Sequence, residues 1–199
     1  MSKQIEFYYD FGSPYTYLAY HRLPVIAAKH GAEIIWKPVL LGGIFQATGN
    51  HSPAEIPLKA IHSQVDLRRW ADRFGVSFTM NPYFPINTLT LMRGATGMQL
   101  RGKKEFDAYN AAIFSAMFEQ PRNLNDPAQL AAVLAAAGFE VADFMAMVGN
   151  PEIKELLKKN TEQAVQRQIF GVPSFFVGEE FYWGQDRLDF VEEALEKSA

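Results

Sequence analysis

The chain has 199 residues, of which 48% are hydrophobic and 21% charged, a composition typical of a globular enzyme and unlike a disordered chain. The net charge is −3, no run of Lys or Arg exceeds two residues, and neither a signal peptide nor a membrane-spanning apolar stretch is evident, so we expect a cytoplasmic protein that binds neither nucleic acid nor membrane. The chain contains no cysteine, which excludes disulfides, thiolate metal sites and thiol chemistry of its own.

The N-terminal part of the chain predicts a β-α-β unit. Residues 4–10 are aromatic-rich and stop before a glycine, as a strand does at a turn. Ser13-Pro14 supplies a helix cap followed by a first-turn proline, and Gly31 ends the helical spacing of apolar residues. Pro24 removes one backbone donor, so this helix is either kinked or broken into two pieces. Residues 33–40 predict a second strand, which a right-handed crossover would place parallel to the first.

Residues 41–170 predict a helical block, because apolar residues recur there every three or four positions. Helix starts are indicated at Asn125-Asp126-Pro127 and at Asn150-Pro151-Glu152. Three glycines are expected to end helices, namely Gly75, Gly102 and Gly138.

Strand character returns after Gly171. Residues 174–177 and 181–183 flank a short turn and predict a β-hairpin. A last helix is expected over residues 186–197.

The order of these elements predicts an α/β fold. The first and last segments can bury their apolar faces only against each other. We therefore expect residues 1–41 and 165–199 to form one sheet-containing domain, and residues 42–164 to form an inserted helical domain.

Three loops are expected to meet at one edge of this sheet, at residues 11–15, 171–174 and 183–187. Ser13 begins the first helix, where unpaired N–H groups and the positive end of the helix dipole stabilise an anion. The simpler interpretation of Ser13 is a plain N-cap, and neither a G-x-S-x-G pattern nor a nearby histidine points to a serine hydrolase. Metal-ligand spacing and glycine-rich phosphate loops are also missing, so we expect no metal and no nucleotide.

Other positions carry open alternatives. The Val172-Pro173 bond is either trans, as in most X-Pro bonds, or cis, which would turn its backbone toward a ligand. Asp186 is either the N-cap of the last helix or a partner for a ligand ammonium group. Asn50 is either a turn residue or an amide that faces a ligand. Phe45 and Phe84 either join the core or line a cleft for a planar substrate.

Five segments carry a further pattern: FYYDFGSPYTYL at 7–18, Gly49-Asn50, VDLRRW at 65–70, FGVPSFF at 170–176 and WGQDRL at 183–188. Together they span nearly the whole chain and resemble the 2-hydroxychromene-2-carboxylate isomerases, relatives of kappa-class glutathione transferases and of DsbA-type oxidoreductases. The resemblance implies a thioredoxin-like fold of the DsbA type with a large all-helical insertion, and a homodimer. It also implies that reduced glutathione binds where the three loops meet.

The resemblance further assigns roles to individual residues. Ser13 matches the catalytic serine of the family. The residues that it implies for glutathione binding are Ser13, Pro14, Tyr15, Asn50, Val172, Gln185 and Asp186, and those for substrate contact are Phe45, Asn50 and Phe84.

The activity implied by the resemblance is a glutathione-dependent cis-trans isomerisation in aromatic hydrocarbon catabolism. It interconverts 2-hydroxychromene-2-carboxylate and trans-o-hydroxybenzylidenepyruvate, with Ser13 stabilising the glutathione thiolate. Two alternatives remain open. One is a kappa-like glutathione transferase or peroxidase, which would consume the thiol, and the other is a non-enzymatic binding protein of thioredoxin fold in which Ser13 is only a cap.

Overall fold

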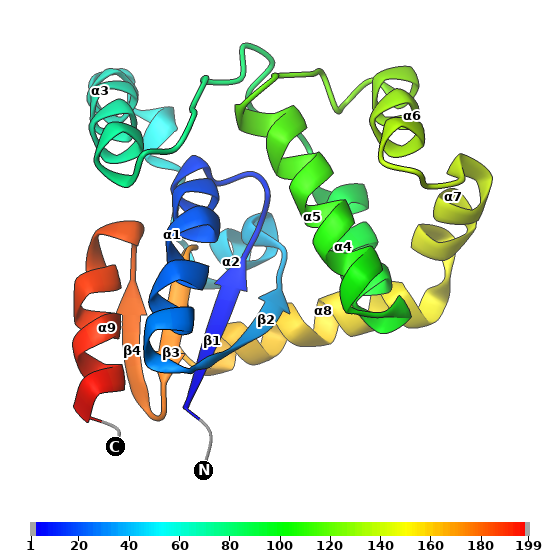
Figure 1. Ribbon diagram of the computed structural model, residues 1–199. Helices are drawn as coiled ribbons and strands as arrows, with labels where there is room; N and C mark the ends of the chain where they lie inside the picture. The colour runs from blue at the N-terminus through cyan, green and yellow to red at the C-terminus, as the bar shows by residue number, and fades with distance from the viewer. Residues whose placement is uncertain (1–2, 198–199) are drawn as a thin grey trace.

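The computed structural model describes residues 3–197 and places β1 (Gln4–Tyr9) inside a four-stranded sheet of order β2-β1-β3-β4 (Figure 1). β2 (Glu33–Pro38) runs parallel to β1, whereas β3 (Ser174–Val177) is antiparallel to β1 and also pairs with β4 (Glu180–Trp183). The predicted β-α-β unit and C-terminal hairpin are therefore confirmed. The last part of the chain pairs directly with the first, so loops that are far apart in the sequence lie at the same sheet.

α1 (Pro14–His30) is a single helix that connects β1 to β2. Ser13 caps it, because the Ser13 Oγ accepts a hydrogen bond from the Thr16 N–H. Gly31 ends it in the left-handed conformation, with φ of 60°, which glycine adopts without steric cost. Pro24 lies inside the helix, so the alternative of two separate helices is wrong.

Different helices cover the two faces of the sheet, because successive strand residues point to opposite sides. Phe7 and Tyr9 point into the large core, which α1 and α9 (Leu188–Lys197) complete. Tyr8 points into a smaller cluster with α2 (Leu41–Thr48) and α8 (Pro151–Gln166). In Figure 1, α1 lies on the near side of the sheet and α8 crosses behind it.

Between β2 and β3 the described chain is helical, as predicted. Besides α2 and α8 it contains η1, a short 3₁₀ helix (Pro53–Glu55), α3 (Pro57–Phe74), α4 (Leu89–Arg101), α5 (Lys103–Phe118), α6 (Pro127–Ala136) and α7 (Val141–Gly149). The predicted starts are confirmed, because Asp126 and Asn150 each accept a hydrogen bond from a first-turn backbone N–H. Gly75 and Gly102 end α3 and α4, and Gly138 follows the end of α6.

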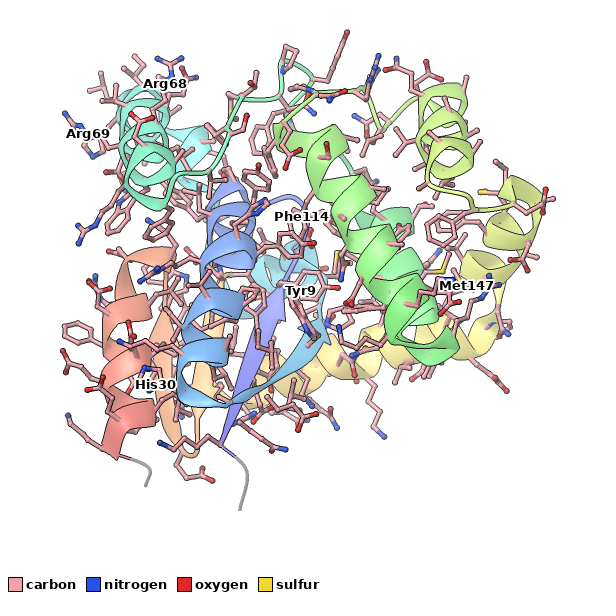
Figure 2. The ribbon with its side chains drawn as sticks, in the orientation of Figure 1. Tyr9, His30, Arg68, Arg69, Phe114 and Met147 are labelled. Atoms are coloured by element: carbon pink, nitrogen blue, oxygen red, sulfur yellow. The ribbon has the colours of Figure 1, made fainter. Side chains whose placement is uncertain are left out.

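An aromatic cluster joins the helical block to the sheet. The ring centre of Phe114, on α5, lies 4.7 Å from that of Phe11 and 4.5 Å from that of Tyr20. The Tyr9 Oη donates a hydrogen bond to Asn110 of the same helix over 3.1 Å, and Figure 2 shows Tyr9 and Phe114 together near the centre of the molecule. One hydrophobic core thus includes residues from both predicted domains. The domain boundaries themselves stay a prediction.

Within residues 3–197, no single helix is both long enough and apolar enough to cross a membrane. α6 and α7 meet those criteria only as a pair, which is bent by 115°.

Candidate active site

Ser13 lies at the N-terminus of α1 and is almost fully buried. Its Oγ donates a hydrogen bond to the Val172 carbonyl oxygen over 3.1 Å and accepts one from the Thr16 N–H over 3.2 Å. The interpretation of Ser13 as a helix cap is therefore confirmed. The same residue also places a hydroxyl proton at the positive end of the α1 dipole, where an anion is stabilised.

The Val172-Pro173 peptide bond is cis, which resolves the alternative left open by the sequence. The Val172 carbonyl faces Ser13, and the Pro173 carbonyl accepts a hydrogen bond from the Gly184 N–H over 2.9 Å. Hydrogen bonds thus join all three predicted loops, and their expected meeting is confirmed. A second cis bond, Phe84-Pro85, was not predicted.

Asn50 fastens the end of α2 to the cis-proline loop. Its Nδ2 donates to the Phe170 carbonyl oxygen over 2.8 Å, and its Oδ1 accepts from the His51 N–H over 2.8 Å. Both ends of the amide are therefore engaged within the protein. The contact of Asn50 with a ligand stays a prediction.

Gln185 and Asp186 lie in a 3₁₀ turn, η2 (Gln185–Arg187), which precedes α9. Asp186 sits inside this turn and α9 begins only at Leu188, so the interpretation of Asp186 as the N-cap of the last helix is wrong. Its carboxylate pairs with Arg187 Nη1 at 2.6 Å and folds back over Gly184, where a Cβ atom would collide with Asp186 Oδ1. Gln185 is buried, whereas Asp186 and its partner Arg187 are both exposed.

Tyr15, the residue after Pro14, is half-buried near two carboxylates. Burial raises the pKa of Tyr15, a hydrogen bond with Ser63 lowers it, and the charges of Asp66 and Asp186 raise it further. Asp66 of α3 and Asp186 of the third loop therefore influence the same side chain. Sequence reasoning did not single out Asp66, and its only signal was its place within VDLRRW. Two carboxylates thus act on Tyr15 through their charge.

Asp10 anchors the loop at residues 11–15, which contains Ser13, from the side of the core. It is fully buried, its Oδ1 accepts a hydrogen bond from the Gly12 N–H over 2.8 Å, and its Oδ2 accepts one from the Leu41 N–H over 2.7 Å. Burial raises the pKa of Asp10, and hydrogen bonds from Gly12, Leu41 and Thr88 limit that rise. Asp10 therefore links the loop to the start of α2 and to the residue before α4. The sequence analysis missed this role.

Phe45 and Phe84 are both half-buried, Phe45 on α2 and Phe84 in the loop before α4. Among the described residues, neither the Phe45 ring nor the Phe84 ring stacks on another aromatic ring, unlike the aromatic residues of the core. Contact of Phe45 and Phe84 with a substrate stays a prediction.

The fold and the site together define the class of protein. A mixed sheet with a helix N-terminus facing a cis-proline loop is a thioredoxin-like arrangement, and here a serine occupies the N-cap position of the helix.

Comparisons with known proteins agree with the thioredoxin-like class and identify a family within it. The family model described as a DSBA-like thioredoxin domain matches residues 4–196. A 2-hydroxychromene-2-carboxylate isomerase of Sphingobium xenophagum is 31% identical over 197 residues, covering 98% of this chain and 99% of that protein. A solved structure of 2-hydroxychromene-2-carboxylate isomerase superposes with a TM-score of 0.84 at 28% identity, covering 98% of this chain and 95% of the other. Glutathione S-transferase kappa 1 of Caenorhabditis elegans is 23% identical, covering 98% of this chain and 91% of that protein.

The chain therefore belongs to the 2-hydroxychromene-2-carboxylate isomerase family of DsbA-like thioredoxin domains, to which the kappa-class glutathione transferases are related. The family resemblance read from the sequence, and the thioredoxin-like fold expected from it, are confirmed.

Proposed function

We propose that this protein is a glutathione-dependent isomerase that interconverts 2-hydroxychromene-2-carboxylate and trans-o-hydroxybenzylidenepyruvate. The observation that carries the proposal is the hydrogen bond from Ser13 Oγ to the Val172 carbonyl, at the N-terminus of α1. This contact places a hydroxyl donor, a helix N-terminus and the cis-proline loop within one buried site. The 31% identity to a named isomerase over nearly the whole chain supports the choice of reaction.

The residues present fit glutathione in three respects. Ser13 and the α1 N-terminus favour a thiolate over a thiol, whose ordinary pKa is about 8.5. The Val172 carbonyl offers an acceptor to the amide of a peptide ligand once Ser13 turns its proton away from it. Asp66 and Asp186 supply negative charge for the ammonium group of the γ-glutamyl end.

If glutathione were bound there, its thiolate would supply a nucleophile for reversible addition to the unsaturated chromene acid, with opening of the ring C–O bond, rotation about the resulting single bond and elimination of the same thiolate, so that no glutathione would be consumed. Ser13 stabilises the negative charge on the sulfur by donating a hydrogen bond from its hydroxyl group. Asp10 fixes the loop at residues 11–15 by accepting hydrogen bonds from the Gly12 and Leu41 N–H groups. Burial of Ser13 keeps water from competing for the same proton.

A steady-state assay tests the proposal. Purified protein should convert 2-hydroxychromene-2-carboxylate only when glutathione is added, and the glutathione concentration should remain constant during turnover. The related kappa transferase favours an alternative in which glutathione is consumed in step with product. Glutathione consumption would support that alternative. Calorimetry that detects no binding at millimolar glutathione would instead support a binding protein in which Ser13 is only a cap.

We expect Asp186→Asn to raise the KM for glutathione by about tenfold and to leave kcat almost unchanged, because a carboxylate that pairs with the ammonium group would contribute binding energy only. Asp189→Asn is the matched control, since Asp189 is an exposed carboxylate one turn further along. Initial rates at varied glutathione concentration measure both constants. An equal effect of the two substitutions would contradict the role of Asp186.

We also propose that the protein acts as a homodimer. α3 exposes an apolar stripe at Leu58, Ile61 and Val65, with Leu58 79% exposed, and such stripes mark interaction surfaces. Light scattering should give twice the mass of the chain, and Ile61→Glu should increase the monomer fraction. A wild-type protein that is monomeric at micromolar concentration would contradict the proposal.

A further inference from the structure

A cavity of about 870 Å³ lies between α2, α4 and α8. Its lining includes none of the residues assigned to glutathione or to the aromatic substrate. Its volume is in the range of sites that bind small organic molecules. The proposed glutathione and substrate sites therefore do not account for this cavity.

Arg93 of α4 is the unusual residue of this cavity. Its guanidinium forms no ion pair within residues 3–197, and its Nε is buried without a hydrogen-bond partner. A buried donor without a partner costs free energy, and pairing the Nη atoms of the same guanidinium with an anion would offset part of that cost. A guanidinium is also the group best suited to hold a carboxylate through two parallel hydrogen bonds.

The other charges around the cavity leave Arg93 available. Glu155 and Glu162 of α8 each lie 3.8 Å from the Lys158 Nζ, so Lys158 partly neutralises both. Lys154 also lines the cavity and forms no ion pair in the described part of the chain. The five charged side chains sum to a formal charge of +1, which favours an anion.

The remaining wall is largely apolar. Leu40, Leu89 and Leu157 come from the end of the β2-α2 connection, from α4 and from α8 respectively. A ligand that fits this surface combines one anionic group with a hydrophobic body.

We propose that the cavity between α2, α4 and α8 is a second ligand site, which binds a small organic carboxylate through Arg93. The carboxylate pairs with the Arg93 guanidinium, and the three leucines contact the apolar part. This site is separate from the loops around Ser13, and the proposal does not depend on the reaction assigned to those loops.

Calorimetry with trans-cinnamate as the probe tests the proposal in the absence of glutathione. Wild-type protein should bind cinnamate, and the uncharged cinnamamide should bind at least about tenfold more weakly because it cannot pair with Arg93. Arg93→Gln should weaken cinnamate binding by about tenfold or more. Arg69→Gln should not weaken it, since Arg69 is exposed on α3, outside the cavity (Figure 2).

A second variant keeps the test independent of any folding defect in Arg93→Gln. Ala47 lines the cavity and is exposed, so Ala47→Phe can fill the space without disturbing the core, and it should also abolish cinnamate binding. Saturating S-methylglutathione should leave cinnamate binding unchanged, because it occupies the Ser13 loops. The proposal is overturned if millimolar cinnamate does not bind, if either cavity variant binds it like wild type, or if S-methylglutathione displaces it.

Discussion

Replacing Ser13 with alanine should lower kcat for the isomerisation by about 100-fold, because loss of one preorganised donor to a buried anion typically costs that much. The same change removes the hydroxyl that caps α1, so the free energy of unfolding should fall by about 1 kcal/mol. The absorbance of the chromene acid at saturating glutathione measures the first effect, and urea denaturation measures the second.

Two variants separate the loss of the donor from the loss of the cap. Asp126→Ala removes the cap of α6 and should cost similar stability without lowering kcat. Ser13→Thr keeps a hydroxyl and should retain more activity than Ser13→Ala. Wild-type kcat in Ser13→Ala would refute the assigned role, and so would an equal loss of kcat in Asp126→Ala.

Replacing Phe114 with alanine should lower the free energy of unfolding by about 3–5 kcal/mol, the usual cost of emptying a large buried aromatic site. Phe114 is 1% exposed and contacts aromatic rings from β1, from the loop that follows it and from α1. Because the cluster joins α5 to the sheet, the wild-type protein should unfold in a single transition when followed by circular dichroism and by tryptophan fluorescence.

Phe190→Ala is the control for this substitution, since Phe190 is 52% exposed on α9 and should cost little. If the wild-type protein instead unfolds in two separate steps, the helical block and the sheet are independently stable units. That outcome would contradict the shared core described here.

Local signals made much of the fold predictable. Ser13-Pro14 and Gly31 mark the two ends of α1 because a cap, a first-turn proline and a left-handed glycine each act within one helical turn. The hairpin of β3 and β4 was equally readable, because its turn and strands occupy adjacent positions. Pro24 could not be decided in this way, since surrounding packing determines whether a helix continues through a proline.

The parts of the site that were missed depend on contacts between distant residues. Asp10 resembles any turn residue at a strand end, and its partner Leu41 is 31 positions away. Asp66 approaches Tyr15 only because α3 packs beside α1. The Val172-Pro173 bond illustrates the same limit, because local statistics favour trans whereas the folded protein contains cis. The sequence around Arg93 gave no sign of a ligand site, because only the folded structure shows that the buried Arg93 Nε has no hydrogen-bond partner.

The central position of β3 imposes an order on the biogenesis of the protein. β3 lies between β1 and β4, although it comes from near the end of the chain. While the ribosome is still translating residues before 174, one edge of β1 has no neighbour, and Ser13 has no Val172 carbonyl to bond. Unpaired strand edges pair with other chains. A chain truncated after α8 should therefore aggregate and lack an assembled site, so β3 protects solubility as well as activity.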